Sequence, residues 1–211
     1  MDRFRRVLPF AAALLLALAF AGLADAAGRR PLPVRMTAAL AGQWKTWWGN
    51  AAFGPAGVTL SSTVPTTPDE THSALVTTKR TWRDQTISFT TSTHAQLRTG
   101  SAPNPWEVGW VMFRFRDLAN YYYFIVKPNG FELGKKQGSD AQIFLATGDL
   151  PRLPLDAAHT VTVQAQGARI QVSVDGRQVV DFTDPHPLLT AGSVGLYEED
   201  SNVAFSSLAV A

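Results

Sequence analysis

The 211-residue chain contains no cysteine. It therefore cannot form a disulfide, and it has no residue to which a lipoprotein anchor could be attached. Its four histidines are not spaced as zinc ligands, and the sequence has neither a Gly-x-Ser-x-Gly nucleophile motif nor a phosphate-binding glycine loop. The sequence thus gives no indication of zinc chemistry, of α/β-hydrolase chemistry or of nucleotide binding through a phosphate loop.

The chain also lacks runs of lysine and arginine. The whole chain has 19 Lys and Arg and 17 Asp and Glu. Three of the Arg and two of the Asp lie in residues 1–26, so the rest of the chain has 16 positive and 15 negative side chains and a net charge of +1. A nearly neutral domain attracts the phosphate backbone weakly, so we expect no nucleic-acid partner.

The first 26 residues have the pattern of a secretory signal peptide. Arginines at positions 3, 5 and 6 precede the apolar run 7–23, and Ala24-Asp25-Ala26 provides small residues for cleavage. We expect cleavage after Ala26 and a secreted or periplasmic protein. An uncleaved signal anchor is the alternative, but the run is shorter than the ~20 residues of a membrane-spanning helix and contains Pro9. No other stretch is apolar enough to cross a membrane, so we expect no span in the mature chain.

About 185 residues remain after such a cleavage, which suits a single domain with a sizeable core. Residues 27–36 contain two prolines and three arginines and are typical of an extended leader. We therefore expect three parts: a signal peptide at 1–26, a leader at 27–36 and one folded domain at 37–211.

Short segments with period-2 alternation dominate the folded part. The expected strands include 86–98, 107–116, 121–127, 131–136, 142–147, 159–166, 169–175, 177–182, 192–197 and 203–210. The pair Asp175-Gly176 predicts a two-residue hairpin turn, and Pro128-Asn129-Gly130 predicts another turn. No segment of ten or more residues after the signal has a helical period. The sequence therefore predicts an all-β fold, an antiparallel sandwich.

The last third of the chain resembles a known family. The segment VTVQAQGARIQVSVDGRQVVDFTD (161–184) and the following GSVGLYEEDSNVAFSSLAV (192–210) resemble the closing half of concanavalin A-like, laminin-G-like jelly rolls. Within that group they are most similar to the 3-keto-disaccharide hydrolase domain family of secreted bacterial proteins. The resemblance covers roughly 82–210.

The resemblance implies two curved antiparallel sheets, a concave face that often binds glycans and frequently a structural calcium. The chain departs from the family at the Asn-Ser-Gly stretch usual near the central strand, where Asn120-Tyr121-Tyr122-Tyr123 stands instead. It also lacks the Glu-x-Asp-x-x-Glu strand of family 16 glycoside hydrolases, and Phe144 follows Gln142-Ile143 where alginate-lyase-like jelly rolls have histidine. Catalysis is therefore left open.

Alternation groups the polar side chains that we expect to bind a ligand. His94, Gln96 and Arg98 fall on one face of one strand, and Trp110 and Arg114 are expected on the same face of a neighbouring strand. An indole ring suits the C–H face of a sugar, and amide and charged groups suit its hydroxyls or a uronate carboxylate. The structural alternative is a solvated outer face.

The candidate catalytic residues, if the domain is an enzyme, are His94, Arg98, Tyr121 and Tyr123. The candidate oxygen ligands for calcium are Asp117 with Asn120 and Asp200 with Asn202, although neither pair belongs to a dedicated loop pattern. We expect a secreted carbohydrate-binding domain that acts on a polysaccharide or oligosaccharide through its concave face. A sugar-active hydrolase or polysaccharide lyase is the first alternative, and a structural envelope or adhesion module is the third.

Overall fold

A computed structural model of the chain describes residues 34–35 and 42–211. The predicted signal peptide and most of the predicted leader lie outside the described residues. Within the described part the elements are strands, and no helix there is long and apolar enough to cross a membrane.

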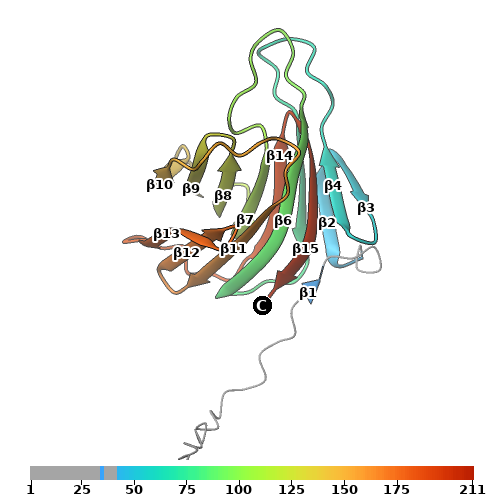
Figure 1. Cartoon of the computed structure of the whole chain (residues 1–211). Coiled ribbons are helices and arrows are strands. Elements are labelled where there is room, and N and C mark those ends of the chain that lie inside the picture. Colours follow the sequence, from blue (N-terminus) through green and yellow to red (C-terminus); the bar gives the residue numbers. More distant parts are fainter. Residues whose placement is uncertain (1–33, 36–41) are drawn as a thin grey trace, which may run out of the picture. The chain divides into compact units, whose positions relative to one another are not determined.

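The strands form two antiparallel sheets (Figure 1). Sheet A contains, in spatial order, β13 (Arg177–Thr183), β12 (Arg169–Val174), β11 (His159–Gln166), β6 (Gln85–Gln96), β15 (Ser201–Val210), β4 (Gly57–Ser61) and β3 (Asn50–Phe53), and β1 (Val34–Arg35) pairs with β15. Sheet B contains β10 (Ile143–Gly148), β9 (Gly130–Gln137), β8 (Asn120–Lys127), β7 (Gly109–Asp117), β14 (Ser193–Glu199), β5 (Ser73–Thr78) and β2 (Trp44–Trp48). The predicted all-β jelly-roll sandwich is confirmed.

The main core lies between the two sheets, where alternate side chains of each strand meet. Ile87 and Phe89 of β6 are buried in the same cluster as Val111 and Phe113 of β7, as their alternation predicted. Removal of this apolar surface from water is the main force that holds the sheets together.

Sheet B is apolar on its outer face as well, which is unusual for a sheet in a two-layer sandwich. A second cluster of buried residues covers this face and consists of Leu75, Val108, Trp110, Met112, Phe115, Tyr121, Tyr123 and Ile125, with Trp47 and Tyr197 packed against it. The central strands β7 and β8 therefore carry buried side chains on both faces.

An irregularity in β7 changes which side chains face the core. Arg114 has a φ of 46°, and the pairing of β7 with β8 shifts between Phe113 and Asp117. Regular alternation over the predicted strand 107–116 places Phe115 on the core side with Val111 and Phe113; that prediction was wrong, because this bulge turns the Phe115 ring to the outer cluster.

Two predicted turns are confirmed. Asp175 and Gly176 have φ values of 50° and 79° between β12 and β13, as a type I′ turn requires. Lys127 pairs with Gly130 at the end of the β8–β9 hairpin.

Candidate functional site

The structure does not bring the five predicted ligand-binding residues together. His94 and Gln96 lie on β6 and Arg98 follows it, whereas Trp110 and Arg114 lie on β7. The prediction that the two strands are neighbours was wrong: β6 pairs with β11 and β15 in sheet A, and β7 pairs with β8 and β14 in sheet B. Alternation shows which side chains of one strand share a face, but it does not show which strands pair.

His94 and Gln96 both bind nearby loops. The exposed imidazole of His94 places Nδ1 2.6 Å from Asp156 Oδ1. The Gln96 side-chain amide donates to the carbonyl of Asn104 at 2.9 Å. These contacts tether the segments 97–108 and 149–158 to the end of β6.

Arg98 lies in a buried ion-pair network. Its guanidinium donates to the carboxylates of Glu107 and Asp200, and it also donates to the Pro68 carbonyl at 2.6 Å. The Arg98 side chain is 7% exposed, and both carboxylates are fully buried. The hydrogen bond to Glu107 is the main cause of a raised pKa of the Arg98 guanidinium, and the charges of Glu107 and Asp200 add to this effect.

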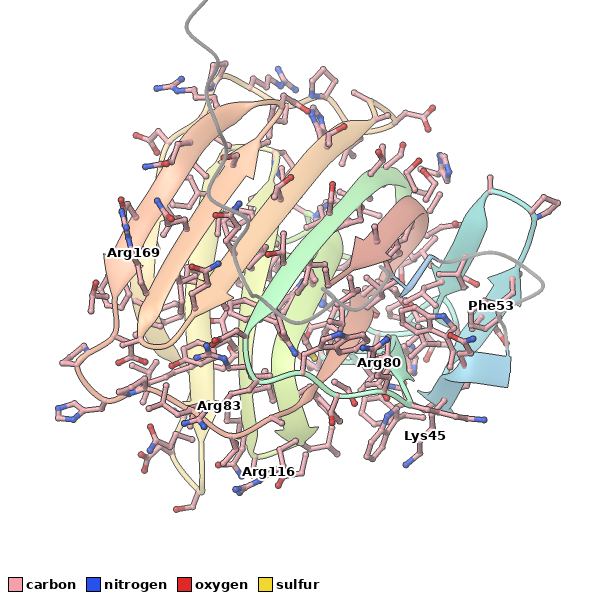
Figure 2. The ribbon with its side chains drawn as sticks, turned by 90° about the horizontal axis from the view of Figure 1, so that it is seen from below. Lys45, Phe53, Arg80, Arg83, Arg116 and Arg169 are labelled. Atoms are coloured by element: carbon pink, nitrogen blue, oxygen red, sulfur yellow. The ribbon has the colours of Figure 1, made fainter. Side chains whose placement is uncertain are left out.

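Arg114 is also buried, and its donors are used within the protein. Its guanidinium donates to the carbonyls of Arg83 at 2.9 Å and Leu188 at 3.2 Å, and it lies 3.4 Å from Asp84. Burial lowers the pKa of Arg114. Figure 2 shows Arg83 and Arg116, which belong to this end of the sandwich, at the lower rim of the view.

Trp110 and two of the three consecutive tyrosines lie on the outer face of sheet B. Tyr121 and Tyr123 share that face and Tyr122 points into the core, as the alternation predicted. The Trp110 ring packs against Tyr123 at a centroid distance of 5.1 Å and against Tyr197 at 5.2 Å. It is 3% exposed, and its indole N–H donates to the carbonyl of Trp106 at 2.8 Å.

A hollow of about 400 Å³ opens on the outer face of sheet B, and we call it the main hollow. Its lining residues come from five strands and two loops: Pro105, Trp106, Trp110, Lys127, Glu132, Gln142, Phe144 and Glu199. The rings of Trp106 and Phe144 are 42% and 63% exposed, which is high for side chains of this size. Such a volume is in the range that holds a small organic ligand.

The polar groups of the main hollow are held in place by neighbours. Glu132 accepts a hydrogen bond from the Tyr123 hydroxyl at 2.9 Å and one from Lys127 Nζ at 3.1 Å. Glu199 accepts from the Tyr197 hydroxyl at 2.6 Å. Burial raises the pKa of Glu199, and the charge of Asp200 adds to this effect. The hollow therefore combines aromatic surface with positioned carboxylates.

A smaller hollow of about 90 Å³ adjoins the main hollow, and we call it the side hollow. The two share Trp110, Gln142 and Glu199 as lining residues. On its other side the side hollow is lined by residues that include Trp48 and Leu118.

The sequence interpretation missed most residues of the two hollows. Alternation along the chain separates three consecutive acidic side chains: Glu198 and Asp200 are fully buried, whereas Glu199 lines both hollows. The sequence interpretation did not assign Trp106 or Phe144 to the site. Trp106 lies in a loop, where an aromatic residue among polar residues was the available signal, and Phe144 lies on the edge strand β10, within the predicted strand 142–147.

Three of the four candidate calcium ligands, Asp117, Asn120 and Asp200, are bound to other groups of the protein. Asp117 accepts from Asn120 at 2.8 Å and from the Ala119 amide, so this pair closes a turn. The Asp200 carboxylate is bound by Arg98 and by the His72 amide. Within residues 34–35 and 42–211, no group of three or more Asp, Glu, His or Cys side chains is arranged to hold a metal ion.

Comparisons with known proteins give the fold and the family. Solved structures with the same fold include the carbohydrate-binding module CBM66 from Bacillus subtilis, with 20% identity, a TM-score of 0.63 and coverage of 82% of this chain and 94% of that chain. A protein of unknown function with a galectin-like fold from Bacillus subtilis is 14% identical, with a TM-score of 0.62, and the match covers 86% of this chain and 96% of that chain. The exoplasmic/lumenal domain of VIP36, in a form bound to Ca²⁺ and Man2, is 14% identical, with a TM-score of 0.57, and the match covers 80% of this chain and 80% of that chain.

No curated protein matches the chain. The model of the 3-keto-alpha-glucoside-1,2-lyase-like domain family matches residues 39–211. This match includes nearly all of the described sandwich, and it agrees with the resemblance found in the hairpin and closing strands. The chain belongs to the 3-keto-alpha-glucoside-1,2-lyase-like domain family.

Proposed function

We propose that this protein is an exported carbohydrate-binding domain that holds a neutral saccharide in the main hollow. The observation that carries the proposal is the pair of exposed rings, Trp106 and Phe144, beside a hollow lined by Glu132, Gln142 and Glu199. In this proposal the outer face of sheet B is the concave face.

The chemistry of the lining suits a saccharide. The apolar C–H face of a sugar ring packs on an aromatic ring, and carboxylate and amide groups bind its hydroxyls. Two large exposed rings at one hollow have little structural purpose, since burial of such rings normally stabilises a fold.

The charges at the main hollow favour a neutral ligand. Lys127 is already bound to Glu132 at 3.1 Å, and Glu199 adds a second carboxyl group. Arg98 and Arg114, which the sequence analysis assigned to a uronate carboxylate, are bound to other groups of the protein. A uronate would therefore meet more negative than positive charge in this hollow.

The comparisons support the proposal at the level of ligand class. One solved structure of the same fold is a carbohydrate-binding module, and another contains Ca²⁺ and a mannose disaccharide. The signal-like segment 1–26, which lies outside the described residues, supports export.

The test is isothermal titration of the folded domain with neutral gluco-, galacto-, manno- and fructo-oligosaccharides of one to four units. Trp106→Ala and Phe144→Ala should each weaken binding about tenfold or more, which corresponds to about 1.4 kcal/mol. Leu189→Ala, which truncates an apolar side chain of similar exposure away from the hollow, should bind as the wild type does. Absence of binding to the whole panel would refute the proposal.

A sugar-active enzyme is the second candidate, and Glu199 is the residue that favours it. A carboxyl group with a pKa raised by burial, beside the Tyr197 hydroxyl in a hollow, is suited to proton transfer. His94 is bound to Asp156 and does not line either hollow.

A hydrolase with two carboxylates is disfavoured by the strand order. Glu132 and Glu199 lie on β9 and β14, three strand spacings or about 14 Å apart in the main chain. Paired carboxyls in glycoside hydrolases are about 5–9.5 Å apart. A lyase-type proton abstraction by Glu199 is the better enzymatic alternative, and absorbance of an unsaturated product that is abolished in Glu199→Gln would establish it.

A further inference from the structure

A single row of side chains crosses the outer face of sheet B from β2 to β9. The pairing places these residues opposite one another in succession: Trp48, Leu75, Tyr197, Trp110, Ile125 and Glu132. The five strand spacings between the first and the last correspond to about 24 Å. A groove that follows this row is much longer than one sugar ring.

The two hollows lie along this row and adjoin each other, and together we call them the groove. Trp110 is in the middle of the row and lines both hollows, as do Gln142 and Glu199. The main hollow reaches Glu132 at one end, and the side hollow reaches Trp48 at the other. A ligand that fills only the main hollow would leave the second half of the groove empty.

A bulge in β2 provides the aromatic ring at the far end. The register shifts between Thr46 and Trp48, so that Trp47 and Trp48 both contact the outer face of sheet B. The Trp47 ring is covered by Lys45, whose ammonium is 3.4 Å from the ring centroid. Figure 2 shows Lys45 at the rim of this part of the molecule.

Trp48 remains available on the surface. It is 36% exposed, and its indole N–H donates to Ser73 Oγ at 2.9 Å, while its ring meets the edge of Trp47 at a centroid distance of 6.3 Å. These contacts fix the orientation of the ring. Leu118, which also lines the side hollow, is 47% exposed.

We propose that the groove binds an oligosaccharide of at least two sugar units, with separate subsites in the two hollows. One sugar packs against Trp106 and Phe144, a second packs against Trp48, and Gln142 and Glu199 bind hydroxyls near the linkage between them. The inference rests on the proposed function, and it adds the size of the ligand and the direction in which it crosses the strands.

The experiment measures affinity as a function of chain length. The wild type is titrated with the one-, two-, three- and four-unit members of the neutral series that binds, and Trp48→Ala, Trp48→Phe and Trp106→Ala are titrated in parallel. The wild type should bind the two- or three-unit member at least tenfold more tightly than the single sugar. Trp48→Ala should remove that increment without changing the affinity for the single sugar, and Trp48→Phe, which keeps a ring, should retain part of it.

Trp106→Ala should weaken binding of every member of the series, because it acts on the first subsite. Equal affinity of the wild type for one and for several units would overturn the two-subsite inference and leave the proposed function intact. An equal loss for all lengths in Trp48→Ala would do the same. Absence of binding to the entire panel would overturn both. Melting temperatures identify any variant that has lost its fold, and Trp48→Phe then decides the question.

Discussion

Replacement of Arg98 by methionine should destabilise the domain strongly. The guanidinium lies between two fully buried carboxylates, Glu107 and Asp200, and its own side chain is 7% exposed. Its removal leaves both carboxylates in the protein interior without their cation. Loss of one partner from such a buried pair costs about 3–5 kcal/mol.

The loss is large against the whole stability of a domain, which is about 5–15 kcal/mol. Arg98 also holds the 62–72 loop through the Pro68 carbonyl at 2.6 Å, so methionine removes a tether as well as a charge. Urea unfolding of the two proteins should show a much lower midpoint for Arg98→Met with an unchanged slope.

Arg169 provides a matched control. It forms a two-pronged ion pair with Asp181, at 2.8 and 2.6 Å, on the solvent side of sheet A, where Figure 2 shows it on the outside of the strands. An exposed pair contributes about 0–1 kcal/mol, so Arg169→Met should have little effect. A loss below about 1 kcal/mol in Arg98→Met would refute the account of the network, and a partial recovery in Arg98→Met/Glu107→Gln would support it.

Three further predictions concern a buried acid, a turn and the N-terminus. Burial raises the pKa of Glu198 to about 7, so the folded protein binds this proton more tightly than the unfolded chain does, and the stability that results is lost as the pH rises from about 4.5 through 7. Glu198→Gln should therefore be more stable than the wild type at pH 8, by on the order of 3 kcal/mol. Urea midpoints that change equally between pH 5 and pH 8 in the two proteins would contradict this prediction. Gly176→Val should lower the stability by about 1–2 kcal/mol, because the φ of Gly176 is 79° and valine is strained at a positive φ. No atom lies within 4 Å of a Cβ added there, so the loss is conformational and not steric, and Gly176→Asn should lose less. An unchanged denaturant midpoint in Gly176→Val would argue against this prediction. Intact mass of exported protein should show a chain beginning at Ala27, and a retained Met1 would overturn the signal-peptide prediction.

The fold was predictable because its signals are local. Strands β11 to β13 alternate over short distances, and the Asp175-Gly176 turn joins two of them directly. Each of these features is a property of a few consecutive residues, which a sequence displays without reference to the rest of the chain.

The site was less predictable because it depends on distant pairing and on two bulges. β7 pairs with β14 about 80 residues later, which brings Trp110 beside Tyr197, and no local pattern contains that contact. The bulge at Arg114 turns Phe115 outward, and the bulge between Thr46 and Trp48 gives β2 two tryptophans on one face.

Arg98 illustrates a third reason. The alternation of β6 was extended to Arg98, but the strand ends at Gln96, and the next segment folds back so that Glu107 meets the guanidinium. A long basic side chain at the end of a strand has the same sequence pattern whether it faces solvent or closes a buried network.

The six tryptophans allow the central claim to be tested in one measurement, because their indole N–H groups give separate signals in a nitrogen–proton NMR spectrum. The domain is titrated with the neutral saccharide that binds it most tightly. The account predicts shifts for Trp106 and Trp110 at the main hollow and for Trp48 at the side hollow, while Trp44 and Trp82 in the main core remain unchanged. Saturable binding that leaves the signals of Trp106 and Trp110 in place would contradict it.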